Sequence, residues 1–160
     1  SVTFGSLTDW STHANPAIRY YSGRAVYRTT FESGDYLRGN QGRLALHLGR
    51  VYNLAQVKLN GQDLGVVWCA PWRVDITDQI VAGVNSLEIT VANLWPNRLI
   101  GDKIIAEDQK ITRTNYNPYR PTDTLLPSGL LGPVTVEVLD FSVEYSDVPL
   151  RYCQKFGSSG

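Results

Sequence analysis

Residues 83–102 read GVNSLEITVANLWPNRLIGD, and this stretch decides the fold because a strand pattern runs directly into a polar loop. In its first half apolar side chains alternate with smaller or more polar ones, at Leu87, Glu88, Ile89, Thr90, Val91 and Ala92. A period of two predicts a β-strand that turns one face toward a core. The loop that follows presents Trp95, Asn97, Arg98 and Asp102 close together in sequence.

The same period recurs along most of the chain. Asn60-Gly61 stands between two alternating runs, and it favours a tight hairpin because both central residues of a type I′ turn need positive φ. Tyr27, Phe31 and Trp68 fall on the apolar phase of their runs, so we expect them in the core. Strands are expected near residues 25–31, 44–48, 57–59, 64–68, 74–76, 134–138 and 141–145. This pattern predicts an all-β fold, an antiparallel β-sandwich of the jelly-roll kind.

Helical patterns are scarce. A short helical turn is expected over residues 78–82, because Thr77 is a suitable N-terminal cap and Gly83 a suitable end. A second turn is expected near residues 104–110. Gly129 and Gly132 are expected to allow a close approach of the backbone just before the strand that begins near Val134.

Length and charge exclude several classes of protein. The chain has 160 residues, which suits one domain with a sizeable core, and its 15 basic and 15 acidic residues give a net charge of zero. Nucleic acid is therefore not an expected partner, and a membrane is not expected either because no long apolar run is present. No signal peptide is recognised, and methionine is absent, which suggests a fragment of a longer chain. We expect one domain over residues 1–155, with 156–160 a linker or tag remnant.

Metal and disulfide chemistry have little support in the sequence. Cys69 and Cys153 are the two cysteines, and they are either one disulfide pair or two small, semi-buried side chains. His13 and His47 stand alone, so a zinc site is not expected. A structural calcium ion is a weaker expectation, since sandwiches of this kind often hold one and Asp, Asn and backbone oxygens would suffice, although no spaced acidic motif marks the site.

The polar loop is the first candidate binding site. An aromatic ring stacks on the C–H face of a sugar, whereas amide, guanidinium and carboxylate groups pair with its hydroxyls. The alternative is a loop that holds itself together with its own hydrogen bonds. Other aromatic and amide side chains lie in segments without strand periodicity, within residues 1–22 and 103–133. The candidate ligand-binding residues are Trp10, Trp95, Asn97, Arg98, Asp102, Tyr116, Asn117 and Tyr119.

Catalysis by this chain alone is not expected. Glycoside hydrolysis usually needs two carboxyl groups that face one cleft. Candidate carboxyl groups occur in or near the long loop, but no spacing pairs them: Asp102, Glu107, Asp108 and Asp123. Ser128 lacks the strand–turn–helix context of a nucleophile elbow. The chain is therefore predicted to be non-catalytic.

Four ordered segments resemble a known family: VKLNGQDLG, APWRVDITDQIVAGVNSLEITVAN with its NRLIGD loop, and LPSGLLGPVTVEV. Together they resemble the sugar-binding β-sandwich of glycoside hydrolase family 2, and look closest to the similar domain attached to family 106 type α-L-rhamnosidases. The resemblance covers about Tyr21 to Tyr145 and implies a galactose-binding-domain-like jelly roll. It also implies that the loops after Val91 and before Val134 lie at the same end of the sandwich. No catalytic barrel is present in this chain.

Three functions follow as hypotheses. The first is a non-catalytic carbohydrate-binding module of a multidomain glycoside hydrolase, with plant-type polysaccharide or oligosaccharide as ligand. The second is a structural accessory domain whose loops complete the active site of an adjacent catalytic domain; in this reading Asn97, Arg98 and Asp102 reach that site or brace the loop. The third is a protein-interaction sandwich such as an adhesin. The expected location is secreted, periplasmic or at a bacterial cell surface.

Overall fold

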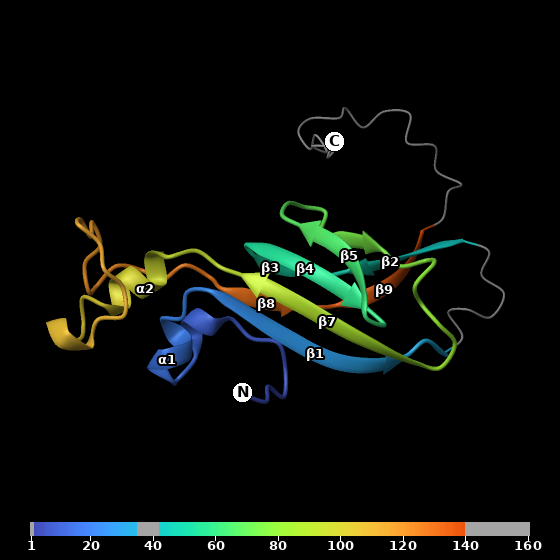
Figure 1. The fold of residues 1–160 in the computed structure, drawn as a ribbon, viewed down its shortest axis with the longest axis horizontal. Helices are drawn as coiled ribbons and strands as arrows, with labels where there is room; N and C mark the ends of the chain where they lie inside the picture. Colours follow the sequence, from blue (N-terminus) through green and yellow to red (C-terminus); the bar gives the residue numbers. More distant parts are fainter. Residues whose placement is uncertain (1, 35–41, 140–160) are drawn as a thin grey trace, which may run out of the picture.

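The computed structural model describes residues 2–34 and 42–139. Strands dominate this part of the chain, and they are joined by short helical segments (Figure 1). The elements, in chain order, are η1 (Trp10–Thr12), α1 (Pro16–Arg19), β1 (Arg24–Glu32), β2 (Arg43–His47), β3 (Arg50–Tyr52), β4 (Leu54–Leu59), β5 (Gln62–Val67), β6 (Arg73–Asp75), β7 (Val84–Ala92), α2 (Pro96–Gly101), η3 (Glu107–Gln109), β8 (Gly129–Gly132) and β9 (Thr135–Leu139).

The strands form three sheets. The largest has four strands in the order β1-β7-β4-β5, the second has three in the order β6-β2-β9, and β3 pairs with β8 in a two-stranded sheet. Every pairing between these named strands is antiparallel. The predicted all-β, antiparallel β-sandwich is therefore confirmed. The strand predicted near 141–145 lies outside the described residues.

The core lies between the sheets and follows the alternation seen in the sequence. In β7, Leu87, Ile89 and Val91 are buried, whereas Ser86 is exposed and Glu88 and Thr90 are only partly covered. The buried apolar side chains of β2, β4 and β7 form one cluster with Leu130 of β8. Tyr27 and Phe31 pack against it as partly buried residues, in line with their predicted core positions.

The hairpin between β4 and β5 forms at the predicted dipeptide. Asn60 and Gly61 both have positive φ, at 51° and 82°, as a type I′ turn requires. Asn60 also donates through its side-chain amide to Oδ1 of Asn85, at 2.8 Å. Asn85 is fully buried at the start of β7 and donates in turn to the carbonyl oxygens of Val81 and Gly83. The hairpin and the segment leading into β7 are thus tied together.

Trp68 is not a core residue, which corrects the prediction. Between the pairs Gln56–Val66 and Lys58–Asp63, β5 carries one residue more than β4, and this bulge reverses the alternation. Gly65, whose φ is 92°, lies within the bulge. Beyond it the partly buried residue is Val67, and Trp68 is 58% exposed on the opposite face. A single extra residue therefore moves the tryptophan from the core to the surface.

The helical segments differ from the predictions. Residues 77–79 form only a turn, in which the amides of Gln79 and Ile80 donate to the carbonyl oxygen of Ile76. Thr77 does not cap a helix; its hydroxyl instead accepts from the amide of Leu44, at 2.9 Å. The turn expected near 104–110 is the 3-10 helix η3, whereas α1 and α2 were not predicted. No helix in the described part of the chain combines the length and apolar character needed to span a membrane.

Candidate functional site

A segment of residues 94–127 extends beyond one end of the sandwich, and we call it the protrusion. It begins where β7 ends, contains α2 and η3, and returns to β8 (Figure 1). Asn93 and Ser128 flank it, and the Asn93 side-chain amide contacts the Ser128 hydroxyl at 3.3 Å. The loops after Val91 and before Val134 therefore lie at the same end of the sandwich, as predicted.

Asn97 fastens the two ends of the protrusion together from α2. Its side-chain amide donates to the carbonyl oxygen of Leu126 at 2.7 Å and to the Ser128 hydroxyl at 3.1 Å. Its side-chain oxygen accepts from the amide of Leu126 at 2.8 Å. Asn97 is only 2% exposed, so these bonds use its donors and acceptor away from solvent. In this structure Asn97 braces the loop and does not face the surface.

Asp102 fastens the middle of the protrusion at the C-terminal end of α2. Its carboxylate accepts from the amide of Thr112 at 2.9 Å, from the hydroxyl of the same residue, and from Arg98 Nη2 at 2.9 Å. Burial raises the pKa of Asp102. The hydrogen bonds from Thr112 and the charge of Arg98 together lower it by more than burial raises it, so the pKa lies below its ordinary value. The carboxylate is thus held ionised inside the protrusion.

Arg98 is the buried partner of Asp102, one helical turn earlier. Its guanidinium lies 6.0 Å from the centre of the Tyr20 ring, which links the protrusion to the N-terminal segment. Nε of Arg98 is buried and has no hydrogen-bond partner among the described residues. A Cβ at Gly101 would lie 2.7 Å from both Arg98 Nη2 and Tyr20, so only glycine fits between them. The arginine is packed within the protein and does not project toward a ligand.

The other predicted residues divide into exposed rings and supporting groups. Trp95 is 72% exposed and Tyr116 is 77% exposed, so both rings are available to a partner or a sugar. Asn117 is half-buried and donates to the carbonyl oxygen of Leu99 at 2.9 Å, which ties the end of the protrusion to α2. Tyr119 is half-buried nearby in sequence. Direct ligand contact by these four residues stays a prediction.

Trp10 is buried, which corrects its prediction as a ligand-binding residue. It is 3% exposed, and its indole nitrogen donates to the Tyr27 hydroxyl at 2.6 Å. Its ring packs so closely on Gly129 that a Cβ there would lie 2.6 Å from the indole. Trp10 was misplaced because its segment has no strand periodicity, although it joins the same core as the strands.

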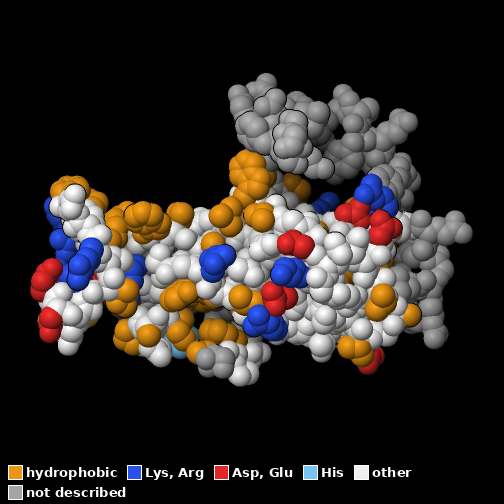
Figure 2. All heavy atoms as spheres, in the orientation of Figure 1, with side chains coloured by type: hydrophobic (Ala, Val, Ile, Leu, Met, Phe, Trp, Pro, Cys, Tyr) orange, Lys and Arg blue, Asp and Glu red, His pale blue; other side chains and the backbone are white. Residues whose placement is uncertain are grey.

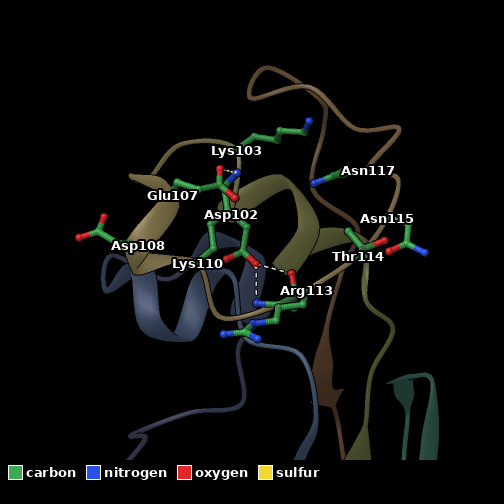
Figure 3. Close-up of a pocket in the computed structure, with 10 residues that line it drawn as sticks. Asp102, Lys103, Glu107, Asp108, Lys110, Arg113, Thr114, Asn115 and Asn117 are labelled. Carbon is green, nitrogen blue, oxygen red and sulfur yellow. Dashed lines mark hydrogen bonds and ion pairs between the residues drawn. The ribbon is translucent and has the colours of Figure 1, made fainter.

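A polar hollow of about 610 Å³ lies on the protrusion, and we call it the tip hollow (Figure 3). Lys110 pairs with Glu107 beside it, while Lys103 and Arg113 have no ion-pair partner among the described residues. The Asp102 carboxylate, labelled in Figure 3, accepts from the amide of Thr112, which also lines the hollow. Charged, hydroxyl and amide groups line it: Asp102, Lys103, Glu107, Asp108, Lys110, Thr112, Arg113, Thr114, Asn115 and Asn117.

A smaller pocket of about 220 Å³ lies where the protrusion leaves the sandwich, and we call it the junction pocket. Half of its lining residues are apolar. Tyr52 at the end of β3 and Asn53 after it contribute a phenol and an amide. Tyr52 and Asn53 were not predicted, because nothing near them in sequence resembles a binding motif. The lining residues are Tyr52, Asn53, Leu94, Pro96, Asn97, Leu126, Pro127 and Ser128.

The remaining chemistry of the described residues is sparse. Among them no group of three or more His, Cys, Asp or Glu side chains is placed to hold a metal ion, so the calcium ion stays a prediction without a located site. Ser128 is buried and its hydroxyl accepts from Asn97, which gives it a structural task. Cys69 is half-buried, and its pairing with Cys153 concerns a residue outside the described ranges.

Six of the large apolar side chains that are exposed in the described part of the chain lie on the protrusion. Figure 2 shows hydrophobic groups along the face that runs from β5 toward α2. Leu94 and Trp95 begin the protrusion, and Ile104, Ile111, Tyr116 and Leu126 lie farther along it, all at least 44% exposed. Exposed apolar groups mark a contact with another protein when they form one contiguous patch.

Comparisons with known proteins agree with this architecture. The family described as "Glycosyl hydrolase 2 galactose-binding domain-like" matches residues 9–120. A Formosa agariphila protein provisionally named a beta-glucuronidase is 38% identical over 161 residues, which cover 86% of this chain and 14% of that protein. The structure of a rhamnosidase from Novosphingobium sp. PP1Y matches with a TM-score of 0.73 and 47% identity, over 81% of this chain and 12% of that one. The resemblance inferred from the sequence is thereby confirmed, and the chain spans only a small part of these relatives.

Proposed function

This chain belongs to the glycosyl hydrolase 2 galactose-binding domain-like family, and we propose that it is a non-catalytic accessory domain of a larger glycoside hydrolase. In this proposal the protrusion packs against the adjacent catalytic domain and helps to shape its substrate pocket. The lengths of the relatives support a longer parent protein, since the matched region is 14% of one and 12% of the other.

One observation carries the proposal: the polar residues of α2 are used inside the protrusion, while six large apolar side chains elsewhere in the protrusion are exposed. Asn97 and Asp102 are each 2% exposed and bond to the segments on either side of them. A loop braced in this way keeps its shape before any partner arrives, which lowers the entropic cost of docking. Ile111 and Tyr116, at 72% and 77% exposed, are then available for an apolar contact with a neighbouring domain.

The test is made in the longer glycoside hydrolase that carries this chain. Ile111→Ser and Tyr116→Ser would each remove an exposed apolar group from the protrusion. We expect each to lower kcat/KM by about tenfold, a loss typical of one misplaced contact at an active-site wall. Because both side chains are exposed, the unfolding midpoint of the 160-residue chain itself should change little.

Val84→Ser is the matched control. Val84 is 63% exposed and begins β7, whereas the protrusion follows the other end of that strand. This variant should leave kcat/KM unchanged. If Ile111→Ser and Tyr116→Ser leave turnover unchanged and only the retention of the enzyme on polysaccharide falls, the accessory role is wrong.

A second candidate function is carbohydrate binding by the domain itself. The observation that favours it is that the protrusion carries two exposed aromatic rings, Trp95 and Tyr116, and also the polar tip hollow. A glycan array followed by calorimetry on the 160-residue chain tests it, and Trp95→Ala should abolish a weak, saturable signal. Absence of a response to every glycan would remove this candidate. A plant-type ligand, secretion and a bound calcium ion belong to this proposal and await their own measurements.

A further inference from the structure

We propose that two copies of this chain pair through the free edge of β1, and that the β1 strand of the second copy lies antiparallel along it. The inference does not rest on the proposed function, because β1 is outside the protrusion. β1 is the first strand in the order β1-β7-β4-β5, and among the named strands it pairs with β7. Its other side therefore has no neighbouring strand in the described part of the chain, and Figure 1 shows it as the border of the sheet opposite β5.

The backbone groups of alternate residues in β1 point away from β7. The amide of Ser33, just after β1, donates to the carbonyl oxygen of Gly83 at 2.9 Å and continues the register of β1 on β7. Because the bonded residues alternate along an antiparallel strand, the odd-numbered residues of β1 bond to β7. The backbone amides and carbonyl oxygens of Val26, Arg28 and Thr30 then point outward along the free edge, where a further strand can bind them.

The residues that lie beside β1 leave this edge open. Residues 2–7 and residues 25–29 line one hollow of about 480 Å³, and no backbone hydrogen bond joins residues 2–7 to the strand. Val26 is 42% exposed, and the Arg28 side chain is 69% exposed. A strand that approaches β1 in the plane of its sheet therefore meets accessible donors and acceptors.

β1 also lacks the features that protect sheet edges from pairing. Edges are commonly blunted by a proline, by a bulge or by a charged side chain on the buried face. β5, at the opposite border, has such a bulge around Gly65, whereas β1 keeps one register with β7 over its nine residues. β1 contains no proline, and its charged residues all lie on the outer face, away from the core: Arg24, Arg28 and Glu32.

The sequence of β1 is complementary to itself about Arg28. When two copies pair antiparallel with full overlap, Arg24 lies opposite Glu32 of the second copy, and two-fold symmetry repeats this opposition at the other end. Val26 then lies opposite Thr30, a pairing of β-branched residues that suits strands. Neither Arg24 nor Glu32 has an ion-pair partner among the described residues. A shift of the register by two residues removes both charge oppositions, so the charges favour the register with full overlap.

The two Arg28 side chains meet at the symmetry axis, and each keeps its own counter-charge. Arg28 Nε donates to Glu88 Oε2 at 2.8 Å, and Glu88 is the residue opposite Arg28 on β7. Each pair is neutral as a whole, which limits the repulsion across the axis. The contact adds about ten backbone hydrogen bonds and joins the two four-stranded sheets into one continuous sheet.

Sedimentation equilibrium of the 160-residue chain tests whether the contact forms. We expect a reversible equilibrium that stops at the dimer, because a two-fold contact uses the β1 edge of both copies. Hydrogen exchange at the Arg28 amide should slow as the dimer forms, whereas exchange at the Tyr27 amide, on the β7 side of the strand, should change less. A monomer at every concentration up to the millimolar range, or growth beyond the dimer, would overturn the proposal.

Charge reversal tests the register. Arg24→Glu and Glu32→Arg each place like charges opposite each other at both ends of the paired strands, so each should weaken dimerisation about tenfold. A mixture of these two single variants has opposite charges at both ends and should form a heterodimer with about the wild-type affinity. The double variant Arg24→Glu/Glu32→Arg should recover that affinity as well. A loss caused by misfolding would not be rescued in this way.

Arg113→Glu is the matched control, since Arg113 is an exposed arginine on the protrusion, and it should leave dimerisation unchanged. Urea unfolding of each variant checks that the fold is retained. A dimer that is insensitive to both single reversals, or that is not restored in their mixture, would reject β1 as the contact. These outcomes are independent of the kinetic test of the accessory role, which measures kcat/KM in variants of the protrusion.

Discussion

Asn97 braces the protrusion from a buried position. Its side-chain amide donates to the Leu126 carbonyl oxygen and to the Ser128 hydroxyl, and its side-chain oxygen accepts from the Leu126 amide. Asn97→Ala should lower the free energy of unfolding by about 1–3 kcal/mol, because it removes the hydrogen bonds of a buried side chain and takes a donor from the buried Ser128 hydroxyl. Urea denaturation measures this, and hydrogen exchange at the Leu126 amide should accelerate. Asn115→Ala, an exposed residue, is the control, and an equal loss in both variants would contradict the bracing role.

Asp102 gives the protrusion a pH dependence. Its pKa lies below the ordinary value, since the opposing effect of burial is outweighed by Thr112 and Arg98. A lowered pKa means that its contribution to stability is complete above the unfolded-state pKa of about 4 and is lost as the pH falls through the lower folded-state value. Asp75 shows a lowered pKa as well, mainly from its bonds with Thr77, so some acid sensitivity is independent of Asp102.

The Asp102→Asn variant separates the acid sensitivity that comes from Asp102 from that which comes from Asp75. At pH 7 it should be less stable by about 3 kcal/mol or more, because Arg98 then stays buried without its counter-charge. Below about pH 4 the difference from the wild type should shrink, since the wild-type carboxylate also becomes neutral. Urea unfolding from pH 7 to pH 2 measures both. Two parallel stability curves would show that the Asp102 charge does not support the protrusion.

At the scale of elements, β8 is positioned by a close contact with the N-terminal segment. Gly129 has a φ of 100°, and a Cβ there would lie 2.6 Å from the Trp10 indole. Gly65 in the β5 bulge has a similar φ of 92° but open space around its Cα. Gly65→Ala should therefore cost only backbone strain, about 1 kcal/mol, whereas Gly129→Ala should cost roughly 2–4 kcal/mol because the buried ring must also move. Similar thermal midpoints for the two variants would rule out the steric contribution of Trp10.

The elements also show which parts of the fold were predictable. The strands at β1, β2, β4 and β7 and the Asn60-Gly61 turn follow from local periodicity and turn chemistry, which depend on neighbours in sequence. Trp68 was misplaced because a bulge is set by pairing with β4, which alternation alone does not reveal. The helix α2 was read as a loop: Pro96 is a favourable first residue, but the six-residue helix has no side-chain cap and owes its stability to long-range bonds.

The candidate site was predicted only in part, because local sequence patterns do not reveal contacts between distant segments. The NRLIGD segment stands out in the sequence, but its residue types suit either ligand binding or bracing of the loop. The structure places Asn97, Arg98 and Asp102 inside, because each finds partners 4 to 31 residues away. Tyr52 and Asn53 could not be recognised, since their pocket exists only where three distant segments meet.

At the scale of the whole molecule, the sandwich is a rigid base from which a braced protrusion extends (Figure 1). The central claim is that this protrusion, and not the far end of the sandwich, contacts the catalytic domain of the parent enzyme. Its exposed rings are convenient reporters, because tryptophan and tyrosine side chains lose accessible area when a partner covers them. Trp95 and Tyr116 lie on the protrusion, whereas Trp68 lies on the outer face of the sandwich, 58% exposed.

Hydroxyl-radical footprinting of the isolated 160-residue chain and of the longer glycoside hydrolase tests this claim most directly. The account predicts that oxidation of Trp95 and Tyr116 falls at least about fivefold in the longer protein, as expected for side chains that become buried in an interface core, while oxidation of Trp68 stays within about twofold. Equal oxidation of Trp95 and Tyr116 in the two proteins would contradict the claim, because the protrusion would then remain as exposed in the enzyme as it is in the domain alone.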